Sequence, residues 1–159
     1  MVLSAIAVVV DVQNVYYTTR QAFGRQFNYR AFWQHLSLMG DIVFANAYAT
    51  DRGDDGQKKF QGALRHIGFE VKLKPYIQRK DGSAKGDWDV GITIDVLDVA
   101  PTVDTVVLLS GDGDFDLLLE KVQAAHGVRA EVFGVPTLTA NSLIMAANAF
   151  TPIDTKFLL

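Results

Sequence analysis

Two uninterrupted apolar runs constrain the fold of this 159-residue chain more than any other feature. The first, AIAVVV, begins at Ala5, and the second, TVVLL, begins at Thr105. A strand covered on one face alternates apolar and polar residues, whereas a strand covered on both faces is apolar throughout. The runs therefore predict central strands of a parallel sheet, because the crossovers between parallel strands place helices on both faces.

The rest of the chain alternates predicted strands and helices. We expect five strands in a mainly parallel sheet, at residues 4–10, 42–49, 69–77, 105–109 and 129–133. Apolar periodicity and end signals predict helices at residues 29–39, 56–67, 87–99, 114–126 and 139–150. Asn28 and Gly40 are the predicted caps of the first helix. This order predicts one α/β domain over residues 1–159.

The composition excludes several classes of protein. The chain contains no cysteine, which rules out disulfides and thiolate metal sites and favours a reducing cytoplasm. The apolar run at residues 5–10 is too short to cross a bilayer, so we expect no membrane partner. Residues 58–85 have a net charge of +6 in a chain of net charge −3. Such a segment is typical of a nucleic-acid track, and equally of a solvated surface.

Four aspartates are expected at the edge of the sheet where parallel α/β proteins bind ligands. They are Asp11, Asp89, Asp112 and Asp114. Two carboxylates about 5 Å apart repel by roughly 3 kcal/mol at an effective dielectric constant of about 20, so four converging ones need a cation. Oxygen ligands without cysteine favour Mg²⁺ or Mn²⁺ over zinc. Taken singly, an Asx turn, a hydrogen-bonded core carboxylate or a helix cap explains each aspartate without a metal.

Polar and basic residues flank this predicted metal site. The candidate substrate contacts are Asn14, Ser110, Lys85, Arg79 and Lys80. Their amide and hydroxyl groups would reach a phosphate oxygen or a water, and their cations would follow a nucleic-acid backbone. Local capping and solvated loop positions explain the same residues without a ligand. Tyr16 and Tyr17 are candidates for base stacking, with a core role as the alternative.

Three sequence blocks together resemble the NYN domain, in its LabA-like branch, which is a group of the PIN-like ribonuclease superfamily. The blocks are DVQN from Asp11, KGDWDV from Lys85 and SGDGDF from Ser110. Their order, spacing and position at strand ends make the resemblance specific over residues 4–150. It implies a PIN-like three-layer α/β/α fold with an acidic pocket that binds Mg²⁺ or Mn²⁺ and, in active members, cleaves RNA.

The same resemblance implies roles for individual residues. Asp11, Asp89, Asp112 and Asp114 match the acidic positions of the family, which are both catalytic and metal-binding. Asn14 matches the polar helper beside the first aspartate. No site position departs from the family pattern.

The function that we expect is that of a metal-dependent ribonuclease, a hydrolase of phosphodiester bonds in single-stranded RNA. The alternative is a non-catalytic regulatory module that binds RNA, a nucleotide or a protein through the same pocket. A phosphoryl-transfer enzyme with Asp11 as nucleophile is disfavoured, because Gln13 stands where such enzymes have a second aspartate. Residues 151–159 are compatible with an edge strand, a docking tail or disorder.

Overall fold

A computed structural model describes residues 3–75, 77–78, 84–85 and 87–159. Its main sheet has six strands in the order β3-β2-β1-β6-β7-β8, and all neighbouring strands are parallel. These strands are β1 (Ala5–Asp11), β2 (Asp41–Asp51), β3 (Glu70–Pro75), β6 (Thr105–Leu109), β7 (Arg129–Gly134) and β8 (Ala149–Pro152). The short strands β4 (Ile77–Gln78) and β5 (Ala84–Lys85) pair with each other in antiparallel fashion. The predicted parallel sheet is confirmed, with six strands instead of five.

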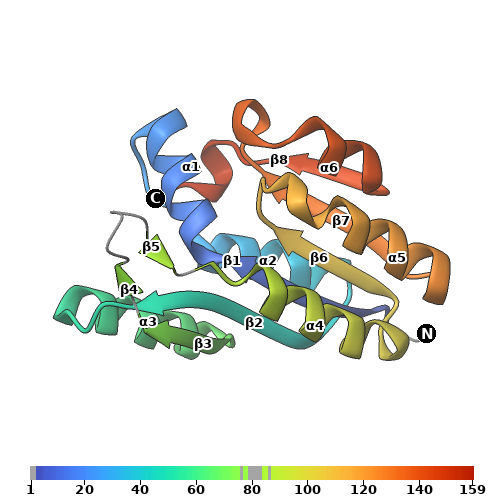
Figure 1. The fold of residues 1–159 in the computed structure, drawn as a ribbon, viewed down its shortest axis with the longest axis horizontal. Coiled ribbons are helices and arrows are strands. Elements are labelled where there is room, and N and C mark those ends of the chain that lie inside the picture. Colours follow the sequence, from blue (N-terminus) through green and yellow to red (C-terminus); the bar gives the residue numbers. More distant parts are fainter. Residues whose placement is uncertain (1–2, 76, 79–83, 86) are drawn as a thin grey trace.

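Helices cover both faces of the sheet, as Figure 1 shows. The α-helices are α1 (Val12–Phe23), α2 (Tyr29–Met39), α3 (Asp55–Ile67), α4 (Asp89–Val99), α5 (Asp116–His126) and α6 (Asn141–Ala146). Short 3-10 turns are η1 (Ala100–Thr102), η2 (Gly113–Phe115), η3 (Pro136–Leu138) and η4 (Thr155–Phe157). Val8 and Val10 of β1 belong to the core under α1–α3, and Ala7 and Val9 to the core under α4–α6. This double burial explains the first apolar run and confirms the three-layer α/β/α fold.

Helix α2 has the predicted bounds and caps, since the side chain of Asn28 accepts a hydrogen bond from the amide of Ala31 at 3.0 Å. Helix α1 was not predicted. The predicted helix 139–150 is wrong in its second half, because α6 ends at Ala146 and residues 149–152 form the edge strand β8. Pairing with β7 determines this strand, and such a distant partner leaves no local signal.

The C-terminal segment packs against the chain that joins α1 and α2. Phe157 and Leu158 are buried, and the amide of Leu159 donates to the carbonyl of Gln26 at 2.8 Å. Residues 151 and 152 belong to β8. Of the three expectations for residues 151–159, the edge strand therefore describes the beginning, and a packed turn describes the rest.

The direction of the winding reverses between β1 and β6. From β1 the chain proceeds to β2 and β3 on one side, and β6, β7 and β8 follow on the other side. The connections after β1 and β6 therefore diverge and leave an opening beside the carboxyl ends of these neighbouring strands. Asp11 is the last residue of β1, and Ser110 directly follows β6. Among the described residues, no helix is long and apolar enough to cross a membrane.

Candidate metal centre

The connection after β6 is hydrogen-bonded to the end of β1 and the start of α1. The buried hydroxyl of Ser110 donates to Asp11 Oδ2 at 3.0 Å and accepts from the amide of Asp112 at 3.1 Å. The amide of Gly111 donates to Asn14 Oδ1 at 2.9 Å. Ser110 and Asn14 therefore hold the two acidic segments together.

The backbone at Gly111 packs closely against Leu138 and Thr139. A Cβ atom at this position would lie 2.6 Å from the carbonyl oxygen of Leu138. The carbonyl of Gly111 also accepts from the amide of Ala140 at 3.0 Å. Glycine is required here because the backbone itself packs against η3 and the residues after it.

The start of α4 is anchored by Trp88. Its indole N–H donates to the carbonyl of Ala49 at 2.9 Å, and its ring lies 5.3 Å from that of Tyr48 between ring centroids. Lys74 covers the ring, with its ammonium 4.5 Å from the centroid. A buried anchor on β2 thus fixes the first turn of α4, where Asp89 is the first residue.

The structure brings three of the four predicted aspartates together. Carboxylate oxygens of Asp11, Asp89 and Asp112 lie within 4.8 Å of one another, in an arrangement that could hold a metal ion. Asp114 is exposed and lies outside this group. Its amide donates to Asp112 Oδ1 at 2.9 Å, which makes Asp112 the cap of η2 as well as a member of the acidic group.

Burial, together with neighbouring negative charges, disfavours the ionised form of two of these carboxyl groups. Burial raises the pKa of Asp11 to about 6, and hydrogen bonds from the Ser110 hydroxyl and the backbone amide of Asn14 oppose this rise. Burial and then the charges of Asp112, Asp87 and Asp11 raise the pKa of Asp89 to about 7. Each carboxylate repels its neighbours at these distances, so a bound cation would stabilise all three ionised forms. A set of oxygen donors of this kind fits a hard divalent cation.

Sequence reasoning did not select Asp87 or Lys74 for the site. Asp87 lies two residues before Asp89 and accepts from its amide at 3.4 Å. The ammonium of Lys74 donates to the carbonyl of Asp87 at 3.3 Å. Asp87 could have been found from the sequence, because it lies two residues before Asp89. Lys74 reaches the site only because its strand, β3, lies beside β2.

The predicted basic contacts fall in a segment of which only part is described. Lys85 is in β5, where its backbone pairs with Ile77. Arg79 and Lys80 lie outside the described residues. Tyr16 and Tyr17 are 47% and 51% exposed, so neither has the core role that was the alternative to base stacking.

The fold and this site together define a class, namely open parallel α/β proteins with an acidic group at the switch point of the sheet. The sequence model of the NYN domain family matches residues 5–154. The chain belongs to the NYN domain family, in its LabA-like branch, and thus to the PIN-like nuclease superfamily.

Three known proteins are similar to this chain. "Low amplitude and bright protein LabA" of Synechococcus elongatus is 29% identical over 129 residues, or 76% of this chain and 69% of LabA. A Vibrio parahaemolyticus protein of unknown function, VPA0982, is 53% identical, with a TM-score of 0.94 over 99% of this chain and 97% of that one. Ribokinase from Giardia lamblia is 12% identical, with a TM-score of 0.53 over 96% of this chain and 58% of that one. This last likeness shows the fold alone.

Proposed function

We propose that this chain, as a single NYN domain, is a ribonuclease that hydrolyses phosphodiester bonds in single-stranded RNA with Mg²⁺ or Mn²⁺. The observation that carries the proposal is the group formed by Asp11, Asp89 and Asp112, whose oxygens lie within 4.8 Å of one another. Membership of the PIN-like nuclease superfamily supports the reaction type. The absence of cysteine fits activity in a reducing cytoplasm.

The three carboxylates would hold the cation. When bound, it would supply positive charge against the phosphate oxygens and lower the pKa of a water. Ser110 would orient Asp11 through its 3.0 Å hydrogen bond, and Asn14 would fix Gly111 through its 2.9 Å bond. Hydrolysis joins the water oxygen to phosphorus and breaks the bond from phosphorus to the leaving oxygen, which takes up a proton.

Two assignments within this mechanism follow from position. Asp89 is a better candidate than the exposed Asp114 for orienting the attacking water, because it belongs to the group of three. Asp114 would then act from the outer edge of the site. Lys85, Arg79 and Lys80 remain the proposed contacts to the RNA backbone, since they precede α4 in the basic segment of the chain.

The test is cleavage of end-labelled single-stranded RNA with Mg²⁺, Mn²⁺ or EDTA. We expect metal-dependent products from the native chain and none from Asp112→Asn. Asp98→Asn, in an exposed position of α4, serves as the control and should cleave normally. Retention of RNA on a filter without products at any metal concentration would favour the non-catalytic regulatory module instead. Products that persist in Asp112→Asn would contradict the proposed site.

A further inference from the structure

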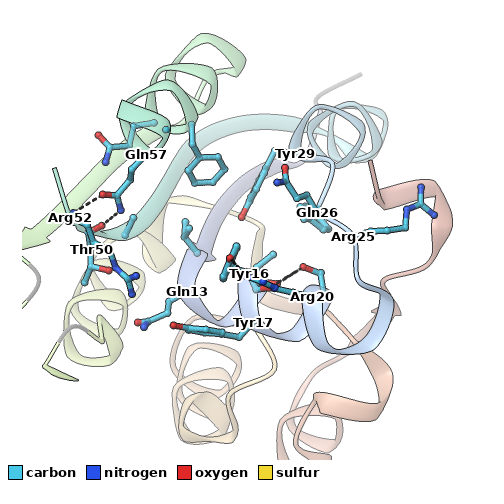
Figure 2. Close-up of a pocket in the computed structure, with 18 of the residues that line it drawn as sticks. Gln13, Tyr16, Tyr17, Arg20, Arg25, Gln26, Tyr29, Thr50, Arg52 and Gln57 are labelled. Atoms are coloured by element: carbon cyan, nitrogen blue, oxygen red, sulfur yellow. Dashed lines mark hydrogen bonds between the residues drawn. The ribbon is translucent and has the colours of Figure 1, made fainter. Parts of the chain in front are cut away.

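A second hollow of the molecule lies beside the acidic group and is not used by the proposed mechanism. It is a pocket of 670 Å³ between α1, α3 and the end of β2 (Figure 2). We refer to it as the α1–α3 pocket. Val12 and Gln13, which directly follow Asp11, form part of its wall. Its volume falls in the range of sites that enclose small organic ligands.

The walls of the α1–α3 pocket are largely aromatic and aliphatic. Tyr29 and Phe60 stand edge to face, with ring centroids 5.7 Å apart. Tyr16 and Val15 of α1 also line the pocket. Flat rings with aliphatic neighbours form the kind of surface on which a planar heteroaromatic ring binds.

A buried polar group without a partner among the described residues lies in these apolar walls. The side-chain amide nitrogen of Gln61 is buried, the residue being 5% exposed, and it has no hydrogen-bond partner in the part of the chain that the structure describes. A buried donor without a partner is costly. In Figure 2 the hydroxyl of Tyr29 points into the pocket. A ligand with a carbonyl oxygen or ring nitrogen would satisfy the Gln61 amide, and the Tyr29 hydroxyl could also donate to it.

Positive charge surrounds the pocket. Arg20 and Arg52 are among its lining residues, and Asp54 is the one lining acid among the described residues. Arg25 also lines it, but its guanidinium donates to the carbonyl oxygen of Leu159 at 2.8 Å and points away from the pocket in Figure 2. The guanidinium of Arg20 donates to the hydroxyl of Tyr16. Three arginines against one described acid in the lining favour a ligand with a negative group near the rim.

We propose that the α1–α3 pocket binds a nucleotide, with the base against Tyr16, Tyr29 and Phe60 and the phosphate toward the arginines. A base acceptor would take the hydrogen bond of Gln61. The same chemistry has two sources, a free nucleotide or a nucleotide of the RNA strand that enters the acidic site. Only the second source rests on the proposed ribonuclease function.

Direct binding in EDTA tests the pocket without cleavage. The four ribonucleoside monophosphates are titrated into the full chain by calorimetry, with inorganic phosphate as a separate probe. We expect at least one nucleotide to bind, and Gln61→Met and Tyr29→Phe to weaken it about tenfold, the value of one buried hydrogen bond. Tyr48→Phe is the matched control, because it removes a tyrosine hydroxyl that bonds to Asp95 outside the pocket.

Single-stranded oligonucleotides, titrated in the same buffer, distinguish the two sources. If oligonucleotides bind more tightly than monophosphates and Gln61→Met weakens both, the strand supplies the base. If monophosphates bind as tightly as oligonucleotides, the pocket serves a free nucleotide. If no monophosphate binds and Gln61→Met leaves oligonucleotide binding unchanged, the proposal is overturned, whatever the cleavage assay shows. Phosphate binding equal to that of the nucleotides would overturn the base contact as well.

Thermal melting distinguishes the loss of a ligand contact from a loss of folded-state stability. Gln61→Met keeps the length of the side chain and removes the unpartnered amide, so its melting temperature should equal or exceed that of the native chain. If Gln61 had a structural role, the substitution would lower the melting temperature. Weaker nucleotide binding at an unchanged or higher melting temperature therefore supports a binding role, and a lower melting temperature for both pocket variants contradicts it.

Discussion

The acidic group of Asp11, Asp89 and Asp112 and the α1–α3 pocket share helix α1 but differ in charge and in hydrogen bonding. Asn14 of α1 belongs to the first, and Val15 of the same helix lines the second. The hydrogen bonds of Ser110 hold the acidic group in place, but its negative charge is not neutralised. The pocket has little negative charge and an unsatisfied donor in Gln61. A cation would therefore stabilise one region, and a hydrogen-bond acceptor would stabilise the other.

The two regions also influence each other weakly. Burial raises the pKa of Tyr29, and the charge of Asp11 adds to this effect. A cation at the acidic group would reduce the second contribution. Substitutions in one region therefore test whether the other region changes with it.

Asp89→Asn should separate the regions most clearly. Removing one carboxylate removes several kcal/mol of charge stabilisation, so we expect RNA cleavage with Mn²⁺ to fall by about 1,000-fold. Monophosphate binding in EDTA should not weaken, because Asp89 does not line the pocket. Cleavage rates and calorimetry measure the two effects, with Asp98→Asn as the control. Equal losses of cleavage and of monophosphate binding would mean that the two regions form one site.

The raised pKa values of Asp11 and Asp89 should make the stability of the chain depend on pH. The pKa values of Asp11, about 6, and Asp89, about 7, exceed ordinary values, so between pH 4 and 7 the folded chain binds more protons than the unfolded chain. Stability in EDTA should therefore fall as pH rises, by roughly 2–3 kcal/mol for Asp11. Urea denaturation at several pH values measures this slope. Asp11→Asn should reduce this slope and Gln61→Met should not. A flat native profile would contradict the raised pKa values.

Ser110→Ala tests whether the acidic group needs its hydrogen-bonded support. Loss of a group that orients a metal ligand costs about 10–100-fold in activity, and we expect a loss in this range. The Ser110 hydroxyl lowers the pKa of Asp11, so the acidic limb of the pH–rate profile should also move to higher pH. Ser37→Ala, which removes an exposed hydroxyl from α2, is the control. An unchanged pH profile would assign Ser110 a packing role only.

The smallest effect is expected in the pocket. Gln61→Met should raise the free energy of unfolding by about 1 kcal/mol without ligand, because it removes a buried donor that has no partner. Denaturant titration at pH 7 measures this difference. A saturating nucleotide should reverse the order of the two stabilities, since it stabilises only the chain that binds it tightly. Lower stability of the variant without ligand would indicate that the amide already has a partner.

The tertiary structure differs from the predictions where contacts between distant segments determine the local structure. Helix α1 combines β-branched and aromatic residues with weak helix propensity, so its packing on β1 and β2 stabilises it. Residues 149–152 become a strand because β7 offers a free edge. The exposure of Asp114 follows from the cap that Asp112 makes to its amide, which begins η2. The α1–α3 pocket draws on segments from Val12 to Gln61, and no single motif signals it.

The sequence by itself determined the elements whose signals are local. The strand at residues 105–109 and the helix Tyr29–Met39 have their predicted bounds, because continuous apolar residues and cap residues act within a few positions. It also indicated the edge of the sheet where Asp11 and Asp112 meet, since parallel strands end on the same side. Only the tertiary structure decided which carboxylates converge and which donors stay unsatisfied. Both depend on distances between side chains that are far apart along the chain.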